Sequence, residues 1–128
     1  MKIACGTDII EKERIQKAIE NTGEKFLEEI FTPHEVAYCE SKKRQKYQHY
    51  AARFAAKEAT FKALRNMLKD RYSLSWLQIE VVNDEMGKPN IHLINRQYKQ
   101  VLSMDISLSH CKNYAVAQVV VLYEEEKR

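Results

Sequence analysis

The sequence contains little of what marks disordered, disulfide-rich or membrane proteins. Its 128 residues include only 3 glycines, 2 prolines and 3 cysteines. Without long Pro/Gly/Ser tracts, disorder is not expected beyond the termini, and three widely spaced cysteines argue against a disulfide framework. No apolar run approaches membrane-spanning length, and residues 1–8 lack the apolar core of a signal peptide. We therefore expect a cytoplasmic protein.

What the sequence does contain is the composition of an ordinary globular protein. Apolar residues make up 45% of the chain and charged residues 30%. A chain of this length is typical of a single domain, here residues 1–128, and can bury most of its apolar surface. The formal net charge of +3 is small and only weakly suggests a phosphate-bearing or acidic partner.

Hydrophobic periodicity predicts an α+β fold in which one long central helix packs on an antiparallel sheet. An opening strand is expected to bring Asp8 to its C-terminal end, and a capping box, Thr32 to Glu35, is expected to start a helix at Pro33. The expected helices are 11–20, one from residue 24, 33–39, 47–69 and 96–102, with a solvated connection over 40–48. The expected strands are 2–7, 78–82, 90–94, 105–110 and 114–123.

The long predicted helix carries the most informative residues. Its apolar stripe, which runs from Tyr50 to Leu68, is interrupted by Lys57, and Arg53 lies one turn before that lysine. Glu58 points about 100° further round the helix, toward alanines, where a carboxylate has little local reason to be unless it binds a cation. The alternative is that these three residues are the polar border of an amphipathic helix, and periodicity alone does not reject it.

Five ordered motifs resemble the holo-acyl-carrier-protein synthases, the small class of phosphopantetheinyl transferases. The most characteristic is the seven-residue segment from Arg53 to Ala59. The others are Gly6-Thr7-Asp8-Ile9, Phe31-Thr32 with Glu35, Gly87-Lys88-Pro89, and Ser107-Leu108-Ser109-His110 followed by Tyr114-Ala115-Val116-Ala117. Together they extend from about residue 6 to residue 120.

The resemblance implies transfer of the phosphopantetheine arm of coenzyme A to a serine of an apo-acyl-carrier protein, in support of fatty acid biosynthesis. It implies Mg²⁺ held by Asp8 and Glu58, a ligand set that suits a hard cation taking few carboxylates plus substrate oxygens. It implies Lys57 near the transferred phosphorus and Glu35 as the acceptor of the serine proton, although a capping-box glutamate already has a structural role. The implied coenzyme A contacts are Arg53, Lys57, Lys88, Pro89, Ser109 and His110.

The resemblance also implies partners. Acyl carrier proteins are acidic, and the expected docking residues are Arg14, Lys17, Lys25 and Phe26, although glutamates are mixed among them. A homotrimer with active sites between subunits is expected, with the apolar strand 116–122 as interface material, and neither nucleic acid nor membrane is an expected partner. Cys111 departs from the family, which commonly has a polar residue there.

Two other kinds of function remain open from the residues. Arg44, Lys46, Arg53 and Lys57, with nearby tyrosines, would suit a module that binds nucleotides or RNA without catalysis, but this leaves Asp8 and Glu58 unexplained. A zinc protein would use Cys5, Cys39, Cys111 and His110. No pair of these ligands has the close spacing that is typical of structural zinc sites.

Overall fold

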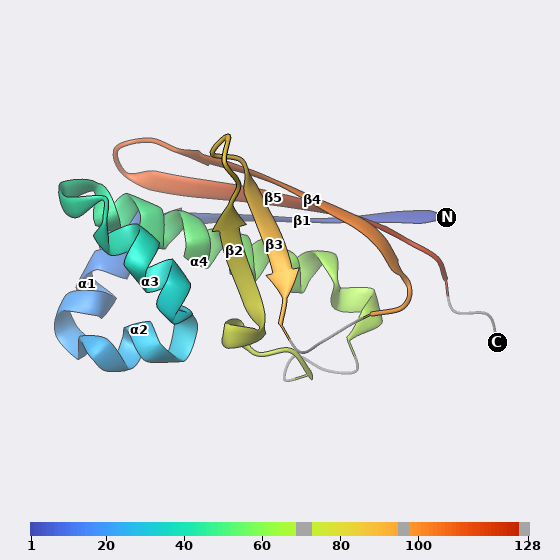
Figure 1. The fold of residues 1–128 in the computed structure, drawn as a ribbon, viewed down its shortest axis with the longest axis horizontal. Helices are drawn as coiled ribbons and strands as arrows, with labels where there is room; N and C mark the ends of the chain where they lie inside the picture. The colour runs from blue at the N-terminus through green and yellow to red at the C-terminus, as the bar shows by residue number, and fades with distance from the viewer. Residues whose placement is uncertain (69–72, 95–97, 126–128) are drawn as a thin grey trace.

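A computed structural model describes residues 1–68, 73–94 and 98–125. It confirms an α+β fold in which a long helix packs on an antiparallel sheet (Figure 1). In chain order the elements are β1 (Lys2–Glu11), α1 (Lys12–Thr22), α2 (Glu24–Ile30), α3 (Pro33–Glu40), η1 (Lys43–Gln45), α4 (Lys46–Ala63), η2 (Arg65–Met67), η4 (Trp76–Gln78), β2 (Ile79–Asn83), β3 (Pro89–Leu93), β4 (Val101–His110) and β5 (Tyr114–Tyr123).

The larger sheet has the strand order β1-β5-β4, and both neighbours of β5 are antiparallel to it. β1 pairs with β5 along its whole length, from Lys2 opposite Tyr123 to Glu11 opposite Tyr114. The prediction that the first strand ends before Asp8 was therefore wrong. Asp8 lies inside β1, opposite Ala117, because the long partner strand keeps the chain extended as far as Glu11.

The helix α4 packs against one face of this sheet (Figure 1). Small side chains allow the close approach, since Ala55, Ala56 and Ala59 have no exposed surface. The closest approach is at Gly6, where a methyl group would lie 2.1 Å from the Ala59 carbonyl oxygen and 2.7 Å from the Ala63 nitrogen. Only glycine fits this position of β1, and its absent side chain sets the distance between strand and helix.

The three short helices gather beside the N-terminal part of α4 (Figure 1). The predicted capping box is confirmed: the Thr32 hydroxyl accepts a hydrogen bond from the Glu35 nitrogen, and the Glu35 carboxylate accepts one from the Thr32 nitrogen. Gly23 separates α1 from α2 with a φ of 58°, a conformation that L side chains rarely adopt. Phe31 and Tyr50, with ring centroids 5.0 Å apart, join this helical group to α4.

Two helix predictions were wrong in extent. The long helix ends at Ala63 instead of continuing to residue 69, which lies outside the described residues. The apolar spacing predicted a longer helix because Leu64 and Leu68 continue its stripe. Both side chains do pack into the core, but from the segment that follows the helix. Of the helix predicted over 96–102, residues 96 and 97 are likewise not described, whereas Val101 and Leu102 belong to β4.

The strands β2 and β3 form a separate hairpin that crosses α4, as predicted to within one residue (Figure 1). The loop 84–88 between them is held by Asp84, whose carboxylate accepts hydrogen bonds from the nitrogens of Met86 and Lys88. In the described part of the chain, no helix is both long and apolar enough to cross a membrane.

Candidate active site

Asp8 lies against the C-terminal half of α4. Its side chain is 17% exposed, and Oδ1 is 3.2 Å from the Lys62 Nζ, which also donates to the Thr7 carbonyl oxygen at 2.9 Å. Glu58, half-buried, is one helical turn before Lys62 and therefore on the same side of α4. The two predicted metal ligands thus face the same region from β1 and α4. We call Asp8, Glu58 and Lys62 the carboxylate group.

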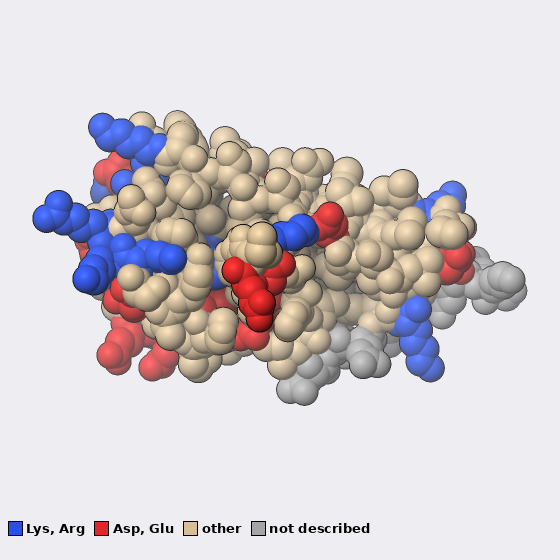
Figure 2. Space-filling view, turned by 45° about the horizontal axis from the view of Figure 1, so that its top comes forward, with Lys and Arg blue, Asp and Glu red and all other residues tan. Residues whose placement is uncertain are grey.

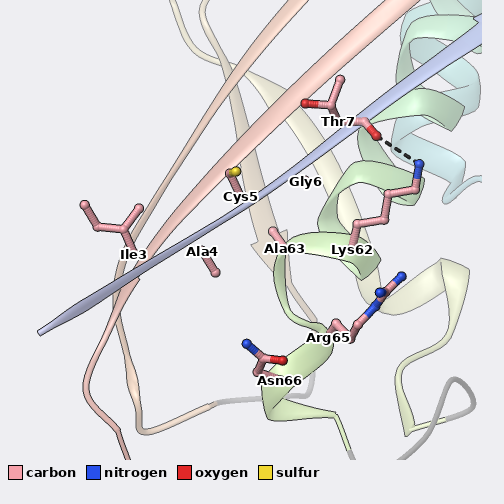
Figure 3. Close-up of a pocket in the computed structure, with 9 residues that line it drawn as sticks. All are labelled: Ile3, Ala4, Cys5, Gly6, Thr7, Lys62, Ala63, Arg65 and Asn66. Carbon is pink, nitrogen blue, oxygen red and sulfur yellow. Dashed lines mark hydrogen bonds between the residues drawn. The ribbon is translucent and has the colours of Figure 1, made fainter.

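Lys62 did not appear among the sequence-based candidates. The available signal was its spacing of four residues from Glu58, which places a cation beside a carboxylate on one helix face. It also lines a pocket of about 430 Å³ along the outer edge of β1, together with Arg65 and Asn66 from the turn after α4. Figure 3 shows the Lys62 side chain reaching back along α4 to the Thr7 carbonyl group.

The donor set of the carboxylate group fits a magnesium ion. Mg²⁺ binds through one or two carboxylates and completes its coordination with phosphate oxygens and water. Among the residues that the structure describes, no three His, Cys, Asp or Glu side chains are arranged to hold a metal, so a soft-metal cage is not present there. The Lys62 ammonium lies against the Asp8 carboxylate, with Nζ 3.2 Å from Oδ1.

Lys57 and Glu35, the two predicted catalytic residues, form a buried ion pair. Neither side chain has exposed surface, and Lys57 Nζ is 2.7 Å from Glu35 Oε1. The ammonium also donates to the carbonyl oxygens of Trp76 at 2.9 Å and Ile79 at 2.5 Å. Glu35 Oε2 accepts from the Val81 nitrogen at 2.8 Å. This pair joins α3, α4 and β2.

The burial has two consequences for the predicted roles. Burial lowers the pKa of Lys57, although the Glu35 carboxylate beside it acts in the opposite direction. In this structure the Lys57 ammonium does not reach a surface where a phosphorus atom would bind, because α3 and β2 enclose it. Both Glu35 oxygens are likewise occupied by donors. The catalytic assignments of both residues stay predictions.

Most of the predicted coenzyme A contacts lie on the other side of α4. Arg53, 2% exposed, donates to Asn83 Oδ1 at the end of β2, and the Asn83 amide donates to the Gly87 carbonyl oxygen beside Lys88. Lys88 Nζ is 2.6 Å from Asp105 Oδ1, which lowers the pKa of that carboxyl. Pro89 begins β3 and Ser109 is exposed on β4. The His110 ring lies 5.9 Å from that of His49 on α4.

Within one chain, the predicted site residues therefore lie in two separate places, on different sides of α4. Asp8 is on β1 and His110 on β4, and these strands are the opposite edges of a sheet whose middle strand is β5. Arg53 and Glu58 are five residues apart on α4, which turns their side chains about 140° from each other. The structure thus brings together Asp8 with Glu58, and Arg53 with His110, but does not unite the two sets within one chain.

The predicted docking residues lie on the short helices. Arg14, Lys17 and Lys25 are all exposed, and Lys17 Nζ is 3.0 Å from Glu13 Oε1 on the same helix. Phe26 is half-buried, with its ring centroid 6.4 Å from that of Phe31. Figure 2 shows Lys and Arg side chains gathered at the end of the molecule where these helices lie, with carboxylates along one border. The surface there has mixed charge with an excess of cations on one side.

The structure disfavours both other kinds of function. All three cysteines are free: Cys39 is buried in α3, Cys5 is exposed on β1 and Cys111 is exposed after the end of β4. Among the described residues, they form no group of three potential ligands with His, Asp or Glu. Burial raises the pKa of the Cys39 thiol to about 12, so the thiol is protonated at neutral pH when no metal is bound. A surface that binds RNA would need Arg53 and Lys57, but both are buried.

Residues 4–119 match the model of the 4'-phosphopantetheinyl transferase superfamily. A holo-acyl-carrier-protein synthase of Ruminiclostridium cellulolyticum is 47% identical over 126 residues, which cover 94% of this chain and 92% of that protein. The fold is similar to two solved holo-acyl-carrier-protein synthases. One, from Helicobacter pylori in complex with coenzyme A, is 31% identical with a TM-score of 0.77 and covers 92% of this chain and 99% of its own. The other, from Bacillus anthracis in complex with CoA (3',5'-ADP), is 36% identical with a TM-score of 0.72 and covers 92% and 94%.

Proposed function

This chain belongs to the 4'-phosphopantetheinyl transferase superfamily, and from that premise we propose that it transfers the 4'-phosphopantetheine group of coenzyme A to a serine of an apo-acyl-carrier protein. The products are holo-acyl-carrier protein and adenosine 3',5'-bisphosphate, and the reaction supports fatty acid biosynthesis. The observation that carries this conclusion is the match to holo-acyl-carrier-protein synthases over nearly the whole chain.

The chemistry exchanges one phosphorus–oxygen bond for another. The serine oxygen of the carrier attacks the phosphorus that bears the pantetheine arm, and the bond from that phosphorus to the departing bisphosphate breaks. The serine loses its proton, and the negative charge on the leaving phosphate increases. The protein therefore has to bind anionic oxygens, hold the two substrates in line and provide a path for one proton.

We assign the pyrophosphate of coenzyme A to the carboxylate group. Asp8 and Glu58 would hold the magnesium ion, which when bound neutralises phosphate charge and withdraws electron density from the phosphorus. Lys62 is already 3.2 Å from Asp8, so its ammonium is positioned to bind a phosphate oxygen once the carboxylate has another cation beside it. Arg65, on the wall of the same pocket, adds a second positive side chain.

For Lys57 and Glu35 we propose a supporting part in catalysis. Their ion pair fixes β2 against α4, and β2 ends at Asn83, the hydrogen-bond partner of Arg53. The pair thereby orients a residue expected on the nucleotide. For Glu35 to accept the serine proton, its carboxylate would have to leave Lys57 and two backbone nitrogens. A water at the carboxylate group is an acceptor that requires no such movement.

We propose that the active enzyme is a homotrimer whose sites lie between subunits. Two features support this. The carboxylate group and the expected nucleotide contacts, Arg53, Lys88, Pro89, Ser109 and His110, lie on opposite sides of α4. In addition, the helices cover one face of the larger sheet (Figure 1), and exposed apolar side chains lie on its other face. Among these, Ile3 is 73% exposed, Ile9 62% and Val120 39%, and such a surface is typical of a subunit interface.

The carrier protein is proposed to dock on α1 and α2. Arg14 and Lys25 are exposed there, and acidic partners are attracted to such a surface. Phe26, half-buried beside them, offers an apolar contact. We place the reaction in the cytoplasm, where free thiols such as the three in this chain persist.

The direct test is to incubate the purified protein with coenzyme A, magnesium and several apo-acyl-carrier proteins, and to weigh each carrier by mass spectrometry. We expect the mass of one carrier to increase by one phosphopantetheine group. A reaction without coenzyme A and a carrier whose serine is replaced by alanine serve as controls. If no carrier gains this mass, the proposed function is wrong.

The position of the site between subunits has its own test. Asp8→Asn and His110→Ala chains, each inactive alone, are unfolded together, refolded and assayed. If each site takes Asp8 from one subunit and His110 from its neighbour, every mixed trimer contains one intact site and activity returns. If both residues serve the same site within one chain, every site in the mixture has a defect and the mixture stays inactive.

A further inference from the structure

A hydrogen bond between two side chains, Thr32 and Glu80, joins the start of α3 to β2. The Thr32 hydroxyl donates to Glu80 Oε2 at 2.5 Å, although the two residues are 48 positions apart in the sequence. The same hydroxyl oxygen caps α3 by accepting from the Glu35 nitrogen. A cap needs only an acceptor, so the hydroxyl proton is left for a second bond, and here a carboxylate accepts it. Short hydrogen bonds to charged acceptors are among the stronger ones in proteins.

Glu80 lies between two core residues of β2. Ile79 and Val81 have no exposed surface, whereas Glu80 points to the opposite face of the strand and is half-buried. The Val81 nitrogen donates to Glu35 Oε2 at 2.8 Å, so β2 meets the start of α3 at two consecutive residues. Burial lowers the pKa of Lys57, and the Glu80 carboxylate, after that of Glu35, acts in the opposite direction. Glu80 is therefore close to the buried ion pair as well.

Further along, α3 and β2 hold Arg53 between them. Tyr38 lies six residues along α3 from Thr32, about 9 Å, and Arg53 Cζ is 4.0 Å from the centroid of its ring. Asn83 lies three residues along β2 from Glu80, about 10 Å, and its Oδ1 accepts from Arg53 Nη2 at 2.7 Å. Each of the two elements thus contributes one group that fixes the guanidinium.

Few other contacts fix the Arg53 side chain. It is 2% exposed, and its Nε has no hydrogen-bond partner among the described residues. Within the same residues, its one side-chain hydrogen bond goes to the neutral amide of Asn83. The place of the guanidinium therefore depends on how β2 and α3 lie relative to each other, which the bond between Thr32 and Glu80 helps to fix.

We propose that Glu80 is a positioning residue, which holds β2 against α3 through Thr32 and thereby fixes the place of Arg53. The inference rests on the proposed function, in which Arg53 contacts coenzyme A. Arg53 lies on the other side of α4 from the carboxylate group, where the bonds change. Loss of the Thr32–Glu80 bond should therefore weaken the binding of coenzyme A without slowing the transfer step, and KM should rise at constant kcat.

The experiment measures kcat and KM for coenzyme A, at saturating carrier protein, in the wild type and three variants. Glu80→Ala removes the acceptor and leaves the cap of α3 intact. Its KM should rise about 10-fold, the usual effect of losing one hydrogen bond to a charged group, with kcat within about a factor of two. Thr32→Ser keeps both the cap and the donor and should match the wild type. Glu125→Ala, the control, removes an exposed carboxylate paired with Lys2 and should also match it.

The ratio of KM to kcat effects separates positioning from simple stabilisation. A bond that only stabilised the fold would lower the fraction of active enzyme, so kcat would fall while KM stayed the same. That result, or wild-type values of both constants in Glu80→Ala, would overturn the inference. If Glu80→Ala does not fold, Glu80→Gln takes its place. Because a neutral acceptor weakens the bond without removing it, the expected rise in KM is then about threefold.

A double-mutant cycle tests whether Glu80 acts through Arg53. Arg53→Lys removes the planar guanidinium that Tyr38 and Asn83 hold. In that background, Glu80→Ala should change KM for coenzyme A by less than about a factor of two, because the group that Glu80 positions is absent. An equal factor in both backgrounds would show that Glu80 acts independently of Arg53 and would reject the proposed role.

Calorimetric titration with coenzyme A, in the absence of any carrier, separates this inference from the proposed function. Binding by the wild type that is about 10-fold weaker in Glu80→Ala, together with no transfer to any carrier, would support the positioning role and reject the transferase. Transfer by the wild type, with equal affinities of the two proteins for coenzyme A, would support the transferase and reject the positioning role. A wild type that neither binds coenzyme A nor transfers its arm would reject both.

Discussion

The contact between β1 and α4 at Gly6 makes a quantitative prediction. In Gly6→Ala the new methyl group would lie 2.1 Å from the Ala59 carbonyl oxygen, whereas ordinary contacts begin near 3.4 Å. Because that oxygen belongs to a helix backbone, strand and helix must separate by about 1 Å, an overpacking that costs about 3 kcal/mol. With an unfolding entropy of about 2.1 cal/mol/K per residue, this lowers Tm by about 10 °C.

The same substitution should reduce activity beyond its effect on stability. Asp8 is two residues from Gly6 on the same face of β1, so separating β1 from α4 moves Asp8 away from Glu58 and Lys62. A misplacement of about 1 Å in a catalytic site can cost about 100-fold in rate. We expect kcat for phosphopantetheine transfer to fall by this order when it is measured well below the lowered Tm.

Gly23→Ala is the matched control. Gly23 has a φ of 58°, so alanine is strained there, but nothing lies within 4 Å of the added methyl group. This variant should lose stability through backbone strain, about 1–3 kcal/mol, and keep its kcat because β1 and α4 do not move. A Gly6→Ala protein with Tm within about 2 °C of the wild type and unchanged kcat would refute our account of the strand–helix contact.

Four other results are expected. Asp8→Asn and Glu58→Gln should each abolish transfer with little change in Tm, since each removes charge from the proposed magnesium site; near-normal transfer by either would reject that ligand. Arg14→Glu should raise KM for the carrier protein and leave KM for coenzyme A unchanged; an unchanged carrier KM would move docking elsewhere. Lys57→Met should lower the free energy of unfolding by about 3–5 kcal/mol, because it leaves a buried carboxylate without its partner; a loss below about 1 kcal/mol in chemical denaturation would contradict this. The pKa of His49 is about 4 in the folded protein and 6.5 ordinarily, so the unfolded chain binds more protons between these pH values. The free energy of unfolding should therefore fall as the pH drops from about 6.5 to about 4, and it should fall less in His49→Gln. Parallel pH profiles of stability for the two proteins would exclude His49 as the cause.

Local sequence signals predicted the parts of the fold that local chemistry determines. The capping box at Thr32 is readable because a threonine, a proline and a glutamate at fixed spacing satisfy the backbone groups at a helix start. The strand Tyr114–Tyr123 is readable from its valine content. By contrast, the length of β1 depends on pairing with a strand more than 100 residues away, and no local pattern contains that information.

The same difference between local signals and long-range contacts applies to the candidate site. Asp8, Glu58, Arg53 and His110 came from motifs, but their separation onto two sides of α4 depends on the strand order, which a motif does not encode. The burial of Lys57 was missed for a related reason. A lysine in an apolar stripe either reaches water or is enclosed, and only the arrival of α3 and β2 decides between these outcomes.

The burial of Cys39 makes its thiol a probe of local opening. Its thiol is fully enclosed and has a pKa raised to about 12, so a thiol-modifying reagent at neutral pH can reach it only when α3 separates from α4. Cys111, exposed at the turn after β4, reacts without such an opening. The rate of the slow labelling phase therefore reports how often α3 opens locally in the folded protein. This helix carries both Glu35 and Tyr38.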